Sequence, residues 1–113
     1  MVNIYGIKTC STVRKAIKFF KDNNIEHSFI DFRATPLQCS KIEYFTSKID
    51  IDTLFNNRGQ KYKDLNLKEL NLDSDGKKEW LCKENMLLKR PVVEYDDKVI
   101  VSFKEDIYKD IFL

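Results

Sequence analysis

The hydrophobic and polar positions in the first third of the chain follow two different periods. Residues Val2 to Ile7 form a short β-branched and aromatic run, which predicts a strand. From Thr12 to Asn23, apolar side chains recur three and four residues apart, which is the pattern of an amphipathic helix. Thr9 and Ser11 are candidate N-caps of this helix. A second strand is predicted from His27 to Phe32, so the segment forms a strand, helix, strand unit with two parallel strands.

The middle of the chain is more polar and helical in its pattern. Residues Leu37 to Lys48 carry an apolar stripe at helical spacing, and a short apolar piece follows from Ile51 to Phe55. Residues Lys61 to Asp75 are polar with scattered leucines, which indicates short helical turns. A further helix is predicted from Lys77 to Met86.

The last third of the chain returns to strands. Residues Pro91 to Tyr95 and Lys98 to Phe103 flank the pair Asp96-Asp97, which predicts a tight hairpin. Lys104 to Phe112 then predicts a closing helix. The complete order is strand, helix, strand, a helical middle, and finally two strands and a helix.

This order of elements defines the expected fold class. A βαβ unit followed by a ββα unit is the topology of the thioredoxin-like fold, an α/β fold with a four-stranded mixed sheet. The helical block, from about residue 35 to residue 88, is expected as an insertion between the two halves. The sequence contains no repeat, low-complexity segment or Gly/Ser/Pro-rich linker, so we expect a single domain covering residues 1–113.

Composition and charge narrow the function classes. The chain has 113 residues and is 42% hydrophobic, which is enough for a folded core. Twenty Lys and Arg against 18 Asp and Glu give a net charge of +2, and the signs are interleaved, so we expect neither nucleic acid nor a membrane as a partner. No apolar run is long enough to span a bilayer and the N-terminus lacks a signal-peptide pattern, so we expect a cytoplasmic protein.

The three cysteines differ in their surroundings. Cys10 falls between the first strand and the first helix, where unpaired N–H groups and the positive end of the helix dipole favour thiolate over thiol. Lys8 stands two residues earlier and adds positive charge. Cys39 and Cys82 lie among apolar residues of predicted helices, so we expect them to be free cysteines with a packing role. The residue three positions after Cys10 is a valine, so a resolving thiol must come from elsewhere in the chain or from a second molecule.

Two arginines are candidates for binding an anion. Arg90 precedes Pro91 in a loop that, in this fold, lies against the turn that carries Cys10, here called the cysteine turn. We expect the peptide bond between Arg90 and Pro91 to be cis. Arg90 would then present a planar cationic donor near Cys10. Arg58 lies in a turn and is a weaker candidate by itself. The single histidine, His27, is expected to be structural, and no residues have the spacing of a metal site or a phosphate-binding loop.

Four blocks of the sequence have the order and spacing of a known family. They are Tyr5-Gly6-Ile7-Lys8-Thr9-Cys10-Ser11-Thr12-Val13-Arg14-Lys15-Ala16, Asn57-Arg58-Gly59 with Tyr62 and Leu65, Leu88-Lys89-Arg90-Pro91-Val92-Val93, and Ser102-Phe103. In combination they resemble the arsenate reductase (ArsC) family, most closely its YffB-type members, which belong to the ArsC/Spx branch of the thioredoxin-like superfamily. The resemblance covers essentially the whole chain.

The resemblance implies a role for each matching residue. Cys10 matches the family's nucleophilic cysteine, and Arg58 and Arg90 match two arginines that surround it. Lys8 and Thr12, which flank the cysteine, are expected to add to the anion site. YffB-type proteins look like glutathione-dependent thiol oxidoreductases. The resemblance therefore implies glutathione as co-substrate, glutaredoxin or thioredoxin as reductant, a small oxyanion or a thiol compound as substrate, and no bound cofactor.

Two alternatives remain open. One is true arsenate reduction, in which the thiolate attacks arsenate, glutathione attaches and glutaredoxin regenerates the enzyme. The sequence departs from that pattern, because Lys8 stands in the stretch where arsenate reductases have a histidine, and Phe103 and Lys104 stand where their third arginine is expected. The other alternative is a Spx-type transcriptional regulator that binds RNA polymerase, although the CxxC switch of that type is absent here.

Overall fold

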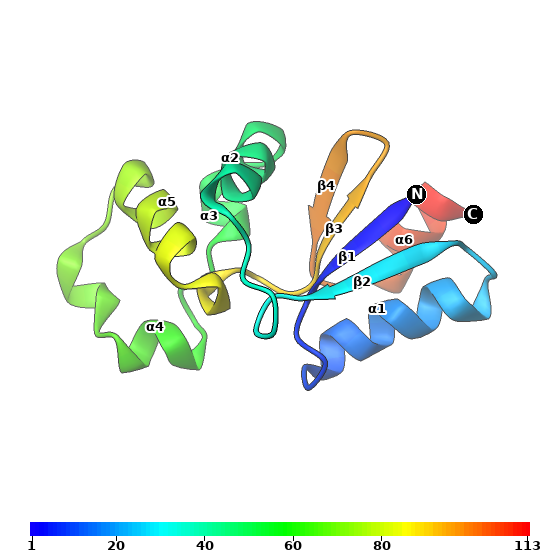
Figure 1. Ribbon diagram of the computed structural model, residues 1–113, viewed down its shortest axis with the longest axis horizontal. Coiled ribbons are helices and arrows are strands. Elements are labelled where there is room, and N and C mark those ends of the chain that lie inside the picture. Colours follow the sequence, from blue (N-terminus) through cyan, green and yellow to red (C-terminus); the bar gives the residue numbers. More distant parts are fainter. The chain divides into compact units, whose positions relative to one another are not determined.

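Four strands form one mixed sheet in the computed structural model, which describes residues 1–113 (Figure 1). They are β1 (Val2–Gly6), β2 (His27–Asp31), β3 (Val92–Tyr95) and β4 (Lys98–Val101), in the spatial order β2-β1-β3-β4. The β1 strand pairs parallel with β2 and antiparallel with β3, and β3 pairs antiparallel with β4. The predicted βαβ and ββα halves, joined in a four-stranded mixed sheet, are confirmed.

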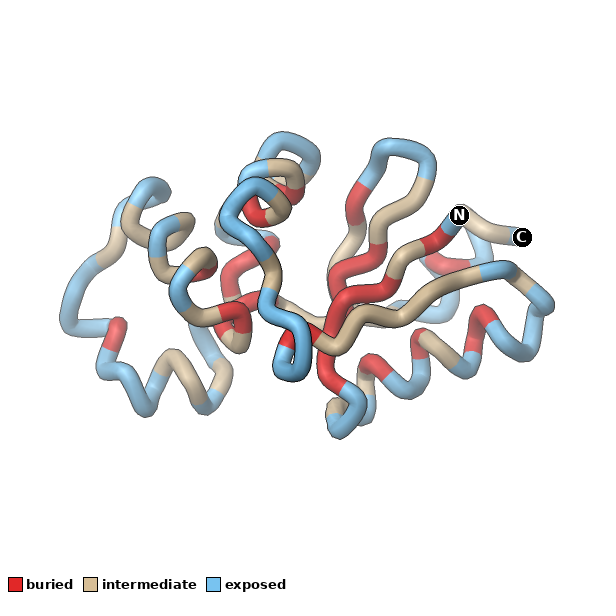
Figure 2. Tube along the Cα trace, viewed as in Figure 1, coloured by how far each residue is buried: buried red, intermediate tan, exposed pale blue.

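Two helices pack on one face of this sheet. They are α1 (Ser11–Asp22) and α6 (Glu105–Phe112). Alternate residues of the strands meet them in a hydrophobic cluster, because successive side chains of a strand point to opposite faces. The buried members of this cluster are Val2, Ile4, Ala16, Phe19, Phe20, Val93 and Tyr108. Figure 2 shows buried and exposed positions alternating along α1, as the helical period of the sequence predicted.

Tyr108 fixes α6 within this unit. Its side chain is fully buried, and its ring meets the rings of Phe19 and Phe103 edge-on. The hydroxyl donates a hydrogen bond of 2.6 Å to the backbone carbonyl of Ser102. Burial raises the pKa of the Tyr108 hydroxyl above its ordinary value, so the donor keeps its proton and the hydrogen bond is intact at neutral pH.

The hairpin between β3 and β4 turns through two residues in the left-handed region. The backbone φ angles are 45° at Asp96 and 59° at Asp97. Two-residue turns with both φ angles positive match the right-handed twist of the flanking strands, and aspartate tolerates that conformation better than most residues. The predicted tight hairpin is therefore confirmed.

The strand β1 and the helix α1 approach each other closely at Gly6. A β-carbon at this position would lie 2.6 Å from Cγ2 of Val13, which is fully buried. Carbon atoms do not approach so closely, so only the hydrogen side chain of glycine fits. Gly6 thus allows the first turn of α1 to pack on the end of β1 and limits the path of the connecting segment, residues 7–10.

Residues 32–89 form a second compact unit, the helical unit, whereas residues 1–31 and 90–113 form the sheet unit. The elements of the helical unit are α2 (Cys39–Lys48), α3 (Ile51–Leu54), α4 (Gln60–Asp64), the 3-10 helix η1 (Leu67–Leu70), α5 (Ser74–Lys83) and the 3-10 helix η2 (Asn85–Leu87). The predicted helical insertion between the two halves of the sheet is present. That the whole chain forms a single domain stays a prediction.

The last helix of this unit differs from its predicted bounds. Asp73 caps the start of α5, where its carboxylate accepts the N–H of Gly76 at 2.8 Å. This cap places the helix start before the expected Lys77. At Glu84 the backbone becomes extended, so the α-helix ends and the chain continues as η2. A single helix from Lys77 to Met86 is therefore wrong.

Cys39 and Cys82 form a disulfide that joins α2 to α5, with their Cα atoms 4.9 Å apart. The prediction that both are free cysteines with a packing role is wrong. Cys39 is exposed, because as the first residue of α2 it lies outside the buried stripe that includes Ile42 and Phe45. The two cysteines are 43 residues apart, and closing a loop of that size stabilises a folded chain by about 4 kcal/mol in the chain-entropy description. Cys10 is the free cysteine.

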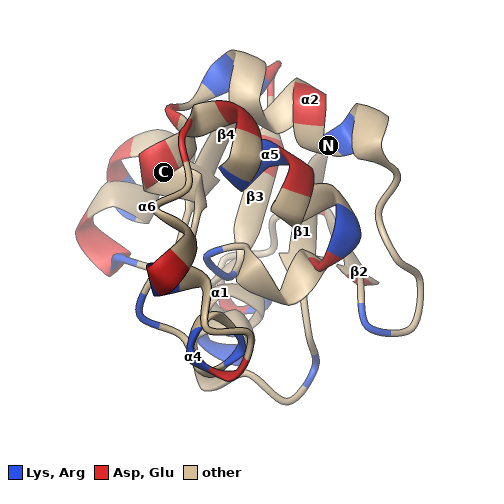
Figure 3. Cartoon of the chain, turned by 90° about the vertical axis from the view of Figure 1, so that its left-hand side faces the viewer, with Lys and Arg blue, Asp and Glu red and all other residues tan.

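Charged residues of both signs are interspersed on the surface. Figure 3 shows Lys or Arg beside Asp or Glu along both α4 and α5. No helix combines the length and the apolar character that a membrane crossing requires.

Replacing Gly6 tests the close approach of β1 and α1. We expect Gly6→Ala to lower the free energy of unfolding by about 1–3 kcal/mol, because the added methyl group overlaps Val13. In Gly6→Ala/Val13→Ala the overlapping methyl groups are gone, so the loss should be smaller than the sum of the two single losses. Urea denaturation of the four proteins measures this coupling. Strictly additive losses would show that the contact with Val13 is not the cause.

Candidate active site

Cys10 is the N-cap residue of α1. Its backbone is extended, and the helix begins with the next residue, Ser11. The cysteine is half-buried and its thiol is free. The prediction that Thr9 or Ser11 caps the helix is wrong, because Thr9 lies in the preceding turn and Ser11 is already helical.

The first turn of α1 leaves its backbone N–H groups available to a group at Cys10. No side chain accepts a hydrogen bond at the N-cap, and no acidic residue stands in the first turn. An N-cap side chain normally accepts from the N–H of the second or third helical residue, and here that side chain ends in sulfur. Unpaired N–H groups and the positive end of a helix dipole attract anionic groups. Thr12, the second residue of the helix, is half-buried in the same turn.

Hydrogen bonds to the backbone hold the turn that carries Cys10. The N–H of Cys10 donates to the carbonyl of Ile7 at 3.2 Å, which closes the turn. The guanidinium of Arg14 donates from Nε to the carbonyl of Lys8 at 3.0 Å and from Nη2 to the carbonyl of Thr9 at 3.2 Å. Sequence reasoning named Arg14 only within the first matching block and gave it no role of its own. The structure shows that it fixes the turn from the helix side.

Asp31 holds the same turn from the strand side. Its carboxylate accepts the backbone N–H of Lys8 at 3.1 Å. Asp31 is the last residue of β2 and pairs with Gly6, the last residue of the parallel strand β1. Sequence reasoning missed this residue. The available signal was its position, since the carboxyl ends of neighbouring parallel strands meet at one edge of a sheet.

The bond between Arg90 and Pro91 is cis, as predicted. Val92 pairs with Tyr5 in the antiparallel register of β3 and β1, so Arg90 and Pro91 join the sheet at the end where β1 leads into the cysteine turn. Pro91 is buried and its carbonyl accepts the N–H of Ser102 at 2.8 Å, whereas Arg90 is half-buried. The sheet unit therefore brings Arg90 to the same edge as Lys8 and Cys10.

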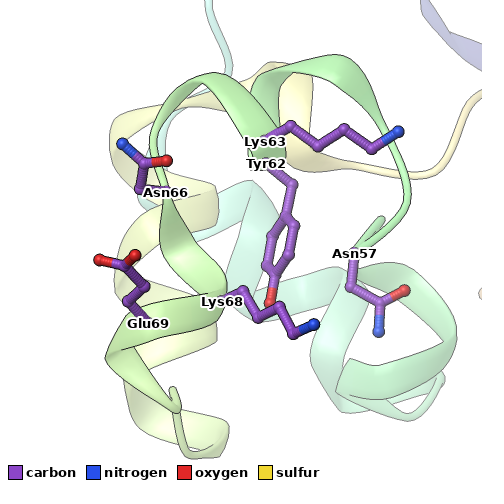
Figure 4. A pocket seen from close by; sticks show the side chains of 6 residues that line it. All are labelled: Asn57, Tyr62, Lys63, Asn66, Lys68 and Glu69. Atoms are coloured by element: carbon purple, nitrogen blue, oxygen red, sulfur yellow. The ribbon is translucent and has the colours of Figure 1, made fainter.

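Arg58 belongs to the helical unit, in the turn before α4. It is exposed, and its backbone N–H donates to the side chain of Asn56 at 3.1 Å. A hollow of about 370 Å³ begins at the preceding residue (Figure 4), and its lining comprises Asn57, Tyr62, Lys63, Asn66, Lys68 and Glu69. Two lysines against one glutamate suit this hollow to a small anion. That Arg58 acts together with Cys10 stays a prediction.

His27 has a structural environment, as expected. Its Nδ1 lies 2.8 Å from the carbonyl oxygen of Ile25, and its ring centroid lies 5.8 Å from that of Phe20. Because His27 pairs with Val2, it lies at the opposite end of β1 from the cysteine turn. At about 3.3 Å per strand residue, this separation is too large for His27 to act as a base for the thiol. No group of three or more His, Cys, Asp or Glu side chains is placed to hold a metal ion.

The sequence matches one known protein family. The model of the ArsC family matches residues 5–111. The chain belongs to the ArsC family. Its matched region includes the cysteine turn, both candidate arginines and the cis peptide bond.

Individual relatives of this ArsC-family chain cover its whole length. An uncharacterized protein of Haemophilus influenzae is 34% identical over 113 residues, which is 99% of each chain. The solution structure of an arsenate reductase (ArsC) related protein from Brucella melitensis is 31% identical, with a TM-score of 0.77 over 98% of this chain and 93% of that one. A protein named YFFB has a TM-score of 0.92 over 100% of both chains at 24% identity, which shows a shared fold.

Replacing Arg14 tests whether it holds the cysteine turn in this ArsC-family chain. Arg14→Lys keeps the charge but loses the planar pair of donors that reaches two carbonyls. We expect faster amide hydrogen exchange at Cys10 and a loss of about 1 kcal/mol in the free energy of unfolding. Lys15→Gln, which changes the charge at an exposed neighbour, serves as the control and should have little effect. Unchanged exchange at Cys10 in Arg14→Lys would show that the turn holds without this residue.

Proposed function

We propose that this ArsC-family protein is a glutathione-linked thiol oxidoreductase that uses Cys10 as its thiolate nucleophile. The family and the arsenate reductase-like fold support a thiol-dependent reductase. The observation that carries the proposal is the position of Cys10, a free, half-buried cysteine at the uncapped N-terminus of α1. A cysteine in that place lies at the positive end of the helix dipole and is reachable by a small substrate.

The proposed reaction is a thiol–disulfide exchange. The Cys10 thiolate attacks one sulfur of glutathione disulfide, a new bond forms between Cys10 and glutathione, and the second glutathione leaves as a thiolate that takes a proton from water. A thiol of glutaredoxin or thioredoxin then attacks the glutathione sulfur and releases the Cys10 thiolate. The electrons come from these thiols, so the reaction needs no bound cofactor, and we place it in the cytoplasm, where such thiols are kept reduced.

Positively charged groups orient the anionic partner in this proposal. Arg90 supplies a planar guanidinium from the edge of the sheet that carries the cysteine turn. Lys8 is exposed in that turn, and Thr12 adds its hydroxyl from the first turn of the helix. Together these three residues would hold the carboxylates of glutathione or a small oxyanion. A contribution of Arg58 stays a prediction that its substitution tests.

Arsenate is the second candidate substrate, because the Brucella melitensis relative is described as related to arsenate reductase. In that reaction the Cys10 thiolate attacks arsenate instead of a disulfide. The cysteine turn of this chain has Lys8 in the stretch where arsenate reductases have a histidine, and its last hairpin is followed by Phe103 and Lys104 in place of a third arginine. Fewer guanidinium groups should bind a tetrahedral oxyanion less well.

Reaction with glutathione disulfide tests the role of Cys10. We expect one glutathione to attach to the protein at Cys10, located by mass spectrometry, because the other two cysteines form a disulfide. Cys10→Ser should carry no such adduct, whereas Cys39→Ser/Cys82→Ser should still carry one at Cys10. Attachment elsewhere in the folded protein while Cys10 stays unmodified would contradict the proposal.

The same preparation separates the two substrates. With glutathione and glutaredoxin present, we expect arsenate-dependent turnover to be weak or absent. A rate comparable to that of an arsenate reductase assayed in parallel would make arsenate the substrate.

Substituting the two arginines tests their separate contributions. We expect Arg90→Ala to slow glutathione attachment by about tenfold, as the loss of a charge-assisted hydrogen bond would do, and Arg58→Ala to slow it less. Arg90→Lys keeps the positive charge but lacks the planar pair of N–H donors of a guanidinium, so its rate of glutathione attachment should lie between those of Arg90→Ala and the native protein. Initial rates measured by mass spectrometry give the comparison. Equal rates of glutathione attachment for the native protein and Arg90→Ala would show that Arg90 does not contribute to the site.

A further inference from the structure

The disulfide between Cys39 and Cys82 takes no part in the function proposed for Cys10. Cys39 is exposed at the first residue of α2, and Cys82 is half-buried near the end of α5. An exposed disulfide is open to attack by a thiol from solution, and exposed disulfides are typically the labile ones. This bond can therefore take part in thiol–disulfide exchange as well as stabilise the fold.

Non-covalent contacts join the same two segments on either side of the disulfide. Before Cys39, the N–H of Leu37 donates to the side-chain oxygen of the buried residue Asn85 at 2.9 Å. One helical turn after Cys39, the carboxylate of Glu43 pairs with Lys78 at 3.7 Å. None of these contacts involves sulfur, so they remain when the S–S bond opens. The two thiols then stay close, which gives each a high effective concentration for the other.

From this arrangement we propose that Cys39 and Cys82 form a reversible redox centre that exchanges with small thiols and disulfides of the glutathione type, with Cys39 as the sulfur that is attacked. The centre uses neither Cys10 nor the arginines of the proposed active site. Cys39 is the attacked sulfur because it is the exposed member of the pair, at the first residue of α2, whereas Cys82 is half-buried.

The exchange balances in two steps. A glutathione thiolate attacks Sγ of Cys39, a mixed disulfide forms, and the Cys82 sulfur leaves and takes a proton from water. A second glutathione thiolate attacks the glutathione sulfur of the mixed disulfide, which releases glutathione disulfide and the Cys39 thiolate. Two glutathione molecules are oxidised and one protein disulfide is reduced. In the opposite direction, the Cys39 thiolate attacks glutathione disulfide and Cys82 displaces the bound glutathione.

The chain on either side of this disulfide forms a hollow of about 200 Å³. Its lining includes Lys83, which directly follows Cys82, and a residue three positions before Cys39. Glutathione carries two carboxylates and one ammonium group at neutral pH. Arg33 and Lys83 in the lining carry positive charge, which suits the carboxylates of this tripeptide.

Opening the bond changes the freedom of the helical unit. The disulfide closes a loop that runs from α2 to α5 and contains Arg58. Without the bond, the packing of α2 against α5 and the flanking non-covalent contacts restrain the two ends of that loop. The redox state of Cys39 and Cys82 therefore adds or removes one of the restraints on the loop that contains Arg58.

The test uses Cys10→Ser, which leaves Cys39 and Cys82 as the only cysteines. We expect excess glutathione to open the bond while circular dichroism still reports a folded protein, and glutathione disulfide to restore it with no lasting adduct. In Cys10→Ser/Cys82→Ser, glutathione disulfide should transfer one glutathione to Cys39, and release the other, on the order of tenfold faster than it does to Cys82 in Cys10→Ser/Cys39→Ser. A bond that opens only when the protein unfolds, lasting adducts on both cysteines, or equal attachment rates would overturn the proposal.

Two matched carboxylate substitutions test the contacts beside the bond. Glu43→Gln removes the ion pair with Lys78, whereas Glu79→Gln changes an exposed residue of α5 and serves as the control. In the Cys10→Ser background, we expect Glu43→Gln to slow closure of the disulfide by about two- to fivefold, and Glu79→Gln to leave it unchanged. Equal closure rates would show that the ion pair does not hold the reduced cysteines together, and would contradict that part of the proposal. The outcome is independent of whether Cys10 reacts with glutathione.

Discussion

The cysteine turn depends on the close approach of β1 and α1 at Gly6. With only hydrogen at that position, Val13 packs directly against the strand, and residues 7–10 must connect two elements that already touch. The chain reverses through the hydrogen bond from Cys10 to Ile7 and delivers the cysteine to the N-cap. Sulfur is a weak hydrogen-bond acceptor and a poor cap by preference. The packing of the strand on the helix, rather than local preference, therefore places this thiol at the helix dipole.

The sheet unit could be predicted almost residue by residue, because its strands and helices have clear and different periods. The helix expected at residues 12–23 is observed at 11–22, and the strand expected at 27–32 is observed at 27–31. The helical unit was harder to predict. Residues with a positive φ angle, such as Asn66 and Asn71, interrupt its short helices, and the spacing of the apolar residues does not show where they occur. The disulfide could not be foreseen at all. Its cysteines are 43 residues apart, and only the packing of α2 against α5 brings them together.

In the candidate site, sequence reasoning found the residues at special backbone positions and missed those that hold the backbone. Cys10 lies where the strand pattern of the sequence ends and the helical pattern begins. Pro91 identifies the one peptide bond expected to be cis, because cis bonds occur almost entirely before proline. Arg14 and Asp31 act through hydrogen bonds to backbone atoms of the turn, which leave no periodic signal in the sequence. As charged residues, Arg14 and Asp31 could be taken from the sequence for catalytic residues. In the structure, both form hydrogen bonds with backbone groups of the turn.

The two places where the helical unit joins the sheet unit lie at one end of the sheet. The chain leaves after Asp31, whose neighbour in β1 is Gly6, and returns just before Val92, whose neighbour is Tyr5. Only β1 separates these two joints, so they are about two strand spacings, roughly 10 Å, apart. A bridge of three or four residues spans that distance. The whole helical unit is therefore, in topological terms, a long same-end connection between β2 and β3, and a short loop in its place would leave the sheet, both of its helices and the cysteine turn connected as they are now.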